Sequence, residues 1–275
     1  FGNLSRLAEN TLAFQEQAKD IATQIEFTSS DIASTQVTLA RAGFTTNTLL
    51  AEQGQLVRQV ADLATSANLD VQQAAEITAV SLGALGFTTE TERLENLSRV
   101  SDVLNLTAAS ATTTIDELSE AIKFAGPLAT QLGIPVEDLG ASLGTLANAG
   151  FRGTIAGTGL RAIFKGLVAP AGRNAEIIKE LGIEINDAQG NFVGLTPVLQ
   201  QFQGALKDLT DSEVSAIAFQ LFGQRGGPAF LNLVNEASGS VAELQEKLFS
   251  AEGVTQDLAE AIRDSASGNI ARLRS

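Results

Sequence analysis

The chain has 275 residues and a net charge of −14, and it contains no Cys, His, Met, Trp or Tyr. Those absences exclude disulfide bonds, thiolate chemistry, a zinc site built on Cys or His, and a Ser-His-Asp triad, so only carboxylate chemistry remains. The acidic balance argues against specific nucleic-acid binding, which needs a basic surface. No apolar run is long enough to predict a membrane-spanning helix. Because no methionine starts the chain, we expect it to be part of a longer protein.

Residues 1–41 predict a helical, coiled-coil-like first segment. Positions that alternate steps of three and four from Leu4 to Leu39 hold eight apolar residues and three threonines. This pattern is typical of a coiled coil, and equally of an amphipathic helix packed on its own domain. The Thr-Ser-Ser-Asp sequence at 28–31 also fits a helix break. Both interpretations stay open at this point.

Residues 42–240 predict one helical domain assembled from helical hairpins. Gly-Phe turns at 43–44, 86–87 and 150–151 separate amphipathic segments. Three threonine–glutamate pairs fit capping boxes at helix starts: Thr89 with Glu92, Thr114 with Glu117, and Thr210 with Glu213. Similar sequences at 63–71 and 128–136 indicate either a duplicated hairpin or chance similarity between alanine-rich helices.

The glycine-rich stretch 139–168 predicts two tightly packed helices at the centre of this domain. Apolar residues recur at helical spacing on both sides of the Gly-Phe turn, among them Leu139, Leu143, Leu160 and Ile163. Glycines four residues apart let two helix backbones approach closely. Each glycine also weakens an isolated helix by roughly 1 kcal/mol relative to alanine. We therefore expect close neighbours to hold this hairpin.

Two stretches interrupt the helical pattern. Residues 183–195 alternate apolar and polar side chains around a polar turn and predict a small β-hairpin. Phe222–Pro228 predicts an irregular connection in which Arg225 lies among glycines. That loop suits an anion, but the Walker spacing is absent and a turn between helices is the simpler interpretation.

The last segment, residues 241–275, predicts helices that lead into a longer chain. The predicted fold class is therefore all-α: a multi-helix assembly of helical hairpins with one small β-hairpin near 183–195.

Paired acidic residues are the candidates for catalysis. Glu137–Asp138, Asp116–Glu117 and Glu90–Glu92 all fall in first helical turns. Carboxylates there complement the helix dipole, which explains them without any reaction. We therefore predict no catalytic residue, no cofactor and no metal ligand, and the chain is not expected to be an enzyme. A cell-wall-degrading enzyme working through two carboxylates is the less favoured alternative.

Residues 139–175 carry four basic residues and no acidic residue, although the whole chain is acidic. These candidate contact residues are Arg152, Arg161, Lys165 and Arg173. Arg161 and Lys165 lie four apart, on one face of a predicted helix. This basic face either pairs with acidic residues elsewhere in the chain, or contacts an acidic partner surface or anionic lipid headgroups.

Several short motifs follow one another in a specific order. They are Ala121–Pro127, Ala141–Gly150, Gly157–Ile163, Leu181–Ile183 with the predicted hairpin, and Leu221–Arg225 followed by an apolar helix. This succession, over roughly residues 50–240, resembles the core region of phage tail tape measure proteins.

The resemblance implies a structural, non-enzymatic role. A tape measure protein helps to set tail length while tube subunits polymerise around it, lies in the tail lumen near the tip, and is released at genome ejection. The implied partners are further copies of itself about the tail axis, with a trimer as one expected state, and tail tube and tail tip or hub proteins. The host membrane during ejection is a further expected contact. Specific nucleic-acid binding is not implied. The implied location is the virion tail, after assembly in the host cytoplasm.

An alternative function follows from the glycine-rich stretch. Residues 139–168 would then insert into a membrane and form part of a genome-delivery channel.

Overall fold

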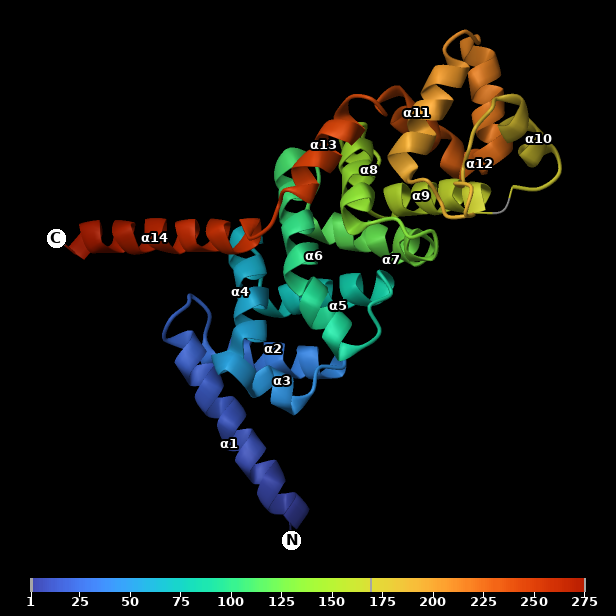
Figure 1. Ribbon diagram of the computed structural model, residues 1–275. Coiled ribbons are helices and arrows are strands. Elements are labelled where there is room, and N and C mark those ends of the chain that lie inside the picture. The colour runs from blue at the N-terminus through green and yellow to red at the C-terminus, as the bar shows by residue number, and fades with distance from the viewer. Residues whose placement is uncertain (1, 169, 275) are drawn as a thin grey trace. The chain divides into compact units, whose positions relative to one another are not determined.

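The computed structural model describes residues 2–168 and 170–274, with side-chain surroundings for residues 9–51, 53–168 and 170–265. Over these residues the chain forms fourteen α-helices, one short 3-10 helix and no β-strand, which confirms the all-α prediction (Figure 1). In chain order the helices are α1 (Gly2–Ala22), α2 (Ser29–Arg41), α3 (Thr46–Leu50), η1 (Ala51–Gly54), α4 (Gln55–Ala67), α5 (Val71–Ala84), α6 (Glu90–Ser110), α7 (Ile115–Gln131), α8 (Val136–Asn148), α9 (Gly153–Val168), α10 (Arg173–Glu180), α11 (Leu195–Leu206), α12 (Asp211–Asn235), α13 (Ser240–Phe249) and α14 (Val254–Arg274).

The helices divide into two compact units. Unit 1 comprises residues 1–83, 87–105 and 252–275, and unit 2 comprises residues 84–86 and 106–251. Each unit buries its own large apolar side chains, for example Leu63 and Leu97 in unit 1 and Phe164 and Phe230 in unit 2. Because the chain returns to unit 1 at its end, α14 packs against α4 within that unit.

The first segment forms two helices, because the chain breaks after α1. Thr28 and Asp31 make a capping box at the start of α2, in which the Asp31 amide donates to Thr28 Oγ1 at 3.3 Å and the Thr28 amide donates to Asp31 Oδ2 at 3.0 Å. The helix break at the Thr-Ser-Ser-Asp sequence is therefore present. α1 and α2 pack on each other and bury Ala18 and Ile32. Leu4 and Leu7 of the predicted heptad lie outside the residues whose side chains are described.

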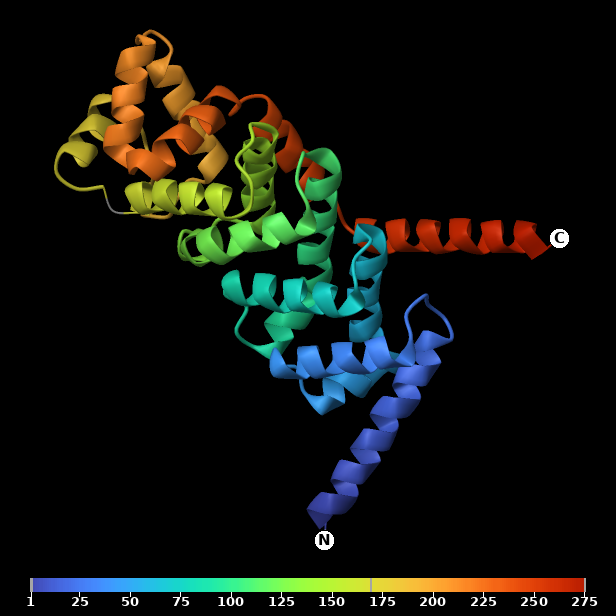
Figure 2. The same ribbon diagram turned by 180° about the vertical axis from the view of Figure 1, so that it is seen from behind.

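In unit 2, α9 packs between α7 and α12, as both side views show (Figures 1 and 2). A Cβ atom added at Gly157 would lie 2.7 Å from the Cα atom of Ala121 on α7. One added at Gly159 would lie 2.9 Å from the Cβ atom of Ala229 on α12. Glycine is thus required where the backbone of α9 meets its neighbours, and the expectation of close neighbours for this stretch is confirmed.

Helix α8 is buried on every side. All twelve residues from Val136 to Ala147 are buried, including the acidic pair Glu137 and Asp138. A helix that is covered all round needs partners for its polar groups. Asp138 finds one on α13, where Gln245 Nε2 donates to its Oδ1 at 2.6 Å.

The irregular connection predicted at Phe222–Pro228 is present but shorter than expected. Two helical stretches of α12 meet at Gly223, whose φ of 67° and ψ of −171° are non-helical, and the helix resumes directly after it. Three phenylalanine rings hold the kink: the centroids of Phe222 and Phe230 lie 4.4 Å apart, and those of Phe202 and Phe230 lie 4.9 Å apart. Phe222 and Phe230, on the two sides of Gly223, thus pack on each other across the break.

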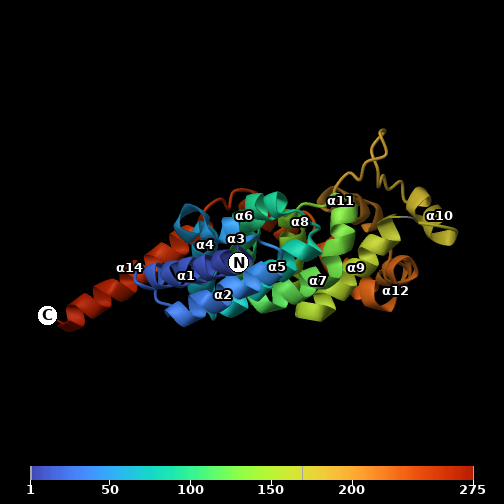
Figure 3. The same cartoon turned by 90° about the horizontal axis from the view of Figure 1, so that it is seen from below.

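The small β-hairpin predicted near 183–195 is reduced to a turn with one antiparallel bridge, Asn186 with Phe192, and the described residues form no strand there. Two backbone hydrogen bonds flank the bridge: the Asp187 amide donates to the Asn191 carbonyl at 2.8 Å, and the Val193 amide donates to the Ile185 carbonyl at 3.0 Å. On the other side of this turn, the side chain of Gln201 on α11 accepts from the Glu184 amide at 2.7 Å and donates to the Glu184 carbonyl at 3.1 Å. Figure 3 shows the connection projecting as a loop between α10 and α11.

Candidate interaction surface

The four candidate contact residues are all exposed in unit 2. Arg161 and Lys165 lie on the face of α9 that is turned away from its buried apolar residues, as the spacing predicts. Arg152 directly precedes α9, and Arg173 is the first residue of α10. The structure therefore places these residues on the surface but on different elements.

Arg173 is already paired within its own helix. Its Nη1 lies 3.2 Å from Glu176 Oε2 and 3.1 Å from Glu180 Oε1. Hydrogen bonds to these carboxylates, Glu176 first, raise the pKa of Arg173. Such an exposed pair contributes little to stability, but it neutralises the charge. Arg173 thus pairs with acidic residues of the same chain, which is the first of the two interpretations given for the basic residues.

The other three candidates, unlike Arg173, form no ion pair with a described carboxylate. Among the residues whose side chains are described, no carboxylate lies within ion-pair distance of Arg152, Arg161 or Lys165. Their positive charges are therefore open to solvent.

Lys165 lines a pocket of about 530 Å³ formed by α9, the segment before α10 and the kink of α12. Arg225 lines the same pocket, although it lies sixty positions further along the chain. Leu221 and Phe222 contribute apolar surface, while Asn174 adds an amide. The sequence singled out both cations separately but gave no local signal that they meet. We call this feature the Lys165–Arg225 pocket.

Small residues explain why α9 and α12 come close enough to form this pocket. A Cβ atom added at Gly166 would lie 2.8 Å from the ring of Phe222. One added at Gly226 would lie 3.0 Å from the Cβ atom of Ala162. The kink at Gly223 then starts a new helical direction just before Arg225. The glycine-rich sequence thus allows close packing of two helices beside two exposed cations.

The acidic pairs lie elsewhere. Burial raises the pKa of Asp138, the hydrogen bond from Gln245 opposes that change, and the charge of Glu137 adds to it. Asp116, Glu117, Glu90 and Glu92 lie in first helical turns, and all three threonine–glutamate capping boxes are confirmed. Within the described part of the chain, no group of three or more acidic side chains is placed to hold a metal ion.

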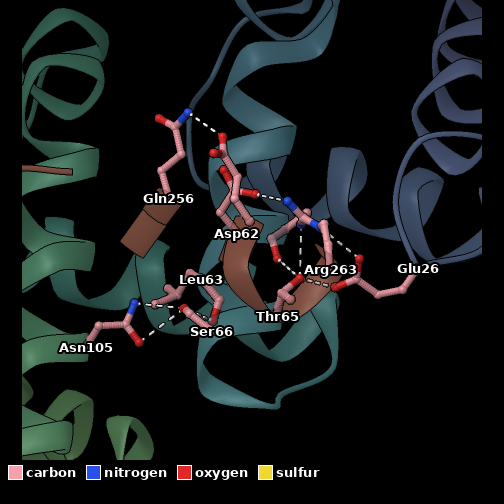
Figure 4. A network of polar contacts seen from close by, with 10 residues as sticks. Glu26, Asp62, Leu63, Thr65, Ser66, Asn105, Gln256 and Arg263 are labelled. Atoms are coloured by element: carbon pink, nitrogen blue, oxygen red, sulfur yellow. Dashed lines mark hydrogen bonds and ion pairs between the residues drawn. The ribbon is translucent and has the colours of Figure 1, made fainter. Parts of the chain in front are cut away.

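A polar cluster that the sequence did not predict attaches α14 to the rest of unit 1 (Figure 4). Arg263 Nη1 donates to Asp62 Oδ1 at 2.6 Å, its Nε donates to Glu26 Oε2 at 2.9 Å, and its Nη2 donates to Thr65 Oγ1 at 3.0 Å. We call these four residues the Arg263 clasp. Its members are up to 237 positions apart, so no local pattern announces it.

The carboxylates of the clasp have opposite pKa shifts. Burial raises the pKa of Asp62, and the hydrogen bond from Arg263 only partly opposes this change. Burial also acts to raise the pKa of Glu26, but hydrogen bonds from Thr65 and Arg263 outweigh it and lower that pKa. The ionised form of Asp62 therefore depends on Arg263 more than the ionised form of Glu26 does.

Asp102 caps the start of α14 within the same unit. Its carboxylate accepts from the Gly253 amide at 2.9 Å and from the Thr255 amide at 2.8 Å. Asn105 Nδ2 donates to Thr255 Oγ1 at 2.8 Å. Ala259, further along α14, is fully buried. Polar bonds from side chains far away in sequence thus determine where α14 begins.

The stretch 139–168 comprises most of α8 and all of α9, helices of 13 and 16 residues. No helix in the described part of the chain is long and apolar enough to cross a membrane.

Comparisons with known proteins support the resemblance to phage tail proteins that the order of motifs indicated. The phage-related minor tail protein family matches residues 15–223. The chain is 28% identical over 266 residues to the tape measure protein of Pneumococcus phage Dp-1, covering 97% of this chain and 22% of that protein. It is 26% identical over 269 residues to the probable tape measure protein of Escherichia phage P2, covering 96% of this chain and 32% of that protein.

The chain thus spans a third or less of the length of these relatives. No solved structure matches it. The match to the family covers most of the chain, and both relatives align over nearly all of it. The chain therefore belongs to the phage-related minor tail protein family, and within it to the tape measure proteins of phage tails.

Proposed function

We propose that this chain is a compact structural segment of a tape measure protein, lying in the tail lumen near the tip, that helps to set tail length and leaves at genome ejection. The observation that supports this proposal is the similarity to two tape measure proteins over 96–97% of the chain. The relatives are much longer, so the segment acts as one part of a larger protein.

This segment folds into compact units and does not form one long helix that could act as a measuring rod. A straight helix of 275 residues would span roughly 410 Å at 1.5 Å per residue. Here the residues form two compact units with buried cores instead. We therefore propose that the segment organises assembly near the tip, and that extended parts of the full protein provide most of the length.

In-frame deletion of the segment from the full-length protein in its phage tests this proposal. Electron microscopy should show absent tails or tails of irregular length. Tails shortened uniformly by about 410 Å would instead mean that the segment measures length as an extended helix. A deletion of equal size in a predicted continuous helical stretch elsewhere in the protein provides the control, and it should shorten the tails.

The loop between α10 and α11 offers a way to locate the segment in the tail. Its residues from Asn186 to Asn191 are exposed, so an epitope inserted after Gln189 should leave the helices intact. Gold-labelled antibody on opened tails should mark one end, next to the tip. Label along the whole tube would contradict the proposed location.

Self-association about the tail axis and contact with tube and hub proteins complete the proposal. Cross-linking of assembled tails, followed by mass spectrometry, should connect copies of this segment with each other and with hub proteins. Links to tube subunits over the whole tail length would contradict a position near the tip.

We also propose a non-enzymatic role for this segment. Zymography on peptidoglycan should show no clearing by the 275-residue chain. Clearing that disappears on substitution of one carboxylate would contradict this role.

A further inference from the structure

The Lys165–Arg225 pocket has the dimensions and the lining of a binding site. Its volume of about 530 Å³ lies within the range of roughly 300–1,000 Å³ that is usual for ligand pockets. Its accessible apolar lining comes from Ala162 of α9 and from Pro170 and Ala171, and the nearly buried Leu221 and Phe222 of α12 form its floor. A few polar groups lie among these side chains, which is the usual composition of a recognition site.

The charges of this pocket lack partners within the described part of the chain. No carboxylate there lies within ion-pair distance of Lys165 or Arg225. Asn174 is already engaged, because it accepts from Gln220 Nε2 at 3.0 Å and donates to the Leu221 carbonyl at 3.5 Å. The two cations and the amide of Gln224 are therefore the groups left to attract a ligand, and the cations select for negative charge.

The apolar lining selects among anionic ligands. A free phosphate would use the cations and leave the apolar surface of Ala162, Pro170 and Ala171 in contact with water. A nucleic acid needs a broad basic surface, whereas this chain carries a net charge of −14. A peptide that presents an apolar side chain beside carboxylates uses both features at once, because covering this apolar surface is favourable.

We propose that the Lys165–Arg225 pocket docks an acidic peptide segment of a partner protein, which places an apolar side chain on the lining formed by Ala162, Pro170 and Ala171 while its carboxylates pair with Lys165 and Arg225. The proposed tail role enters only in the expectation that the partner is another tail protein. Peptide binding itself is a property of the pocket, so it can be tested apart from tail assembly.

Fluorescence anisotropy on the 275-residue chain provides the test. The probe is a labelled hexapeptide with a central Phe-Leu pair flanked by two glutamates on each side. It should bind saturably, and more weakly as salt screens the charges. Replacing the Phe-Leu pair by Ser-Gly should abolish saturable binding. Replacing the glutamates by lysines should do the same.

Charge reversal locates the site. Lys165→Glu and Arg225→Glu should each weaken binding roughly tenfold, because each change turns one attraction into a repulsion. Lys207→Glu is the matched control: Lys207 is exposed in the same unit, does not line the pocket, and undergoes the same change of charge. Circular dichroism should show equal helix content for all variants, since all three positions are exposed.

Three results would overturn the proposal. The first is the absence of saturable peptide binding up to millimolar concentration. The second is an equal loss with Lys207→Glu, which would mean that net charge alone attracts the peptide. The third is binding to phosphatidylserine vesicles without binding to the peptide, which would make the basic face a lipid contact. Failure of the tail-length experiment would leave peptide binding unaffected, so the two proposals fail separately.

Discussion

Where α9 crosses α7, the two helices come so close at Gly157 that there is no room for a side chain. A Cβ atom at Gly157 would collide with the backbone of Ala121, which cannot move as a flexible side chain would. We therefore expect Gly157→Ala to lower the free energy of unfolding by about 1–3 kcal/mol, the usual cost of overpacking a core. Urea denaturation followed by circular dichroism measures this change.

Gly204→Ala provides the matched control. Gly204 lies within α11 in the same unit, and a Cβ atom there would meet nothing within 4 Å. Alanine should therefore keep stability unchanged or raise it by up to about 1 kcal/mol, through its higher helix propensity. Equal effects of the two substitutions would mean that close packing at Gly157 is not what holds α9.

Asp138 provides a prediction about pH. Its folded-state pKa is raised, so the folded chain holds this proton more tightly than the unfolded chain does. Its contribution to stability is therefore complete below the unfolded pKa and is lost as the pH rises through the folded pKa. Asp138→Asn keeps an acceptor for Gln245 but has no charge to bury. The stability of the variant relative to the original chain should therefore rise as the pH increases from below the unfolded pKa of Asp138 through its folded pKa.

Asp187→Asn should show the opposite trend. Hydrogen bonds from the Asn191 amide and side chain lower the pKa of Asp187, which is fully exposed. Its contribution is therefore present above the unfolded pKa and is lost as the pH falls through the folded pKa. Denaturation of both variants across the same pH range tests the two signs together. Relative stabilities that change in the same direction for both variants would contradict one of the two assignments, and profiles with both signs reversed would contradict both.

At the scale of elements, local signals in the sequence predicted the helices well. Each threonine–glutamate capping box forms, because both of its partners lie within one turn. The apolar periodicity of residues 139–168 also gave the correct pair of helices. These features depend on neighbours three or four positions away, which the sequence displays directly.

Elements that depend on distant residues were predicted less well. The alternation at 183–195 suggested two strands, but only the bridge of Asn186 with Phe192 forms, and Gln201 of α11 binds the Glu184 backbone on the other side of the turn. The glycines at 223–227 suggested a longer connection, but the break is confined to Gly223, and the rings of Phe222 and Phe230 pack on each other across it. The meeting of Lys165 with Arg225 in one pocket likewise depends on the packing of α9 against α12. Tertiary contacts decided each of these cases.

The Arg263 clasp provides a prediction for α14. Arg263→Met keeps most of the apolar stem but leaves Asp62, whose side chain is 16% exposed, without its cation. We expect the free energy of unfolding to fall by about 1–3 kcal/mol, the penalty for leaving a buried polar group unsatisfied. Amide hydrogen exchange should become faster in the first turns of α14.

A second substitution and a surface control sharpen that test. Adding Asp62→Leu to Arg263→Met should recover part of the lost stability, because no charge then stays buried. Arg173→Met, which breaks an exposed ion pair, should cost much less stability than Arg263→Met. If Arg263→Met and Arg173→Met were equally mild, the clasp would be an ordinary surface contact that does not hold α14.

At the scale of the whole molecule, the two units differ in how the chain builds them. Unit 2 is nearly continuous, since residues 106–251 supply all of it except residues 84–86. Unit 1 is discontinuous and needs residues 252–275 from the end of the chain. Loss of α14 from unit 1 removes Arg263 from Asp62 and the Gly253 and Thr255 amides from Asp102. The two units should therefore respond differently to truncation.

A fragment of residues 106–251 should fold by itself, with high helix content and a cooperative urea transition, because it keeps the core around Phe164 and Phe230. A fragment of residues 1–105 should be less stable than the same residues in the whole chain, since Asp62 and Asp102 lose their partners. Joining residues 252–275 to that fragment through a flexible linker should restore its stability, and Arg263→Met in the joined chain should remove part of the gain. Equal stability of residues 1–105 with and without the joined helix would mean that α14 contributes nothing to unit 1, and an unfolded 106–251 fragment would mean that unit 2 is not an independent folding unit.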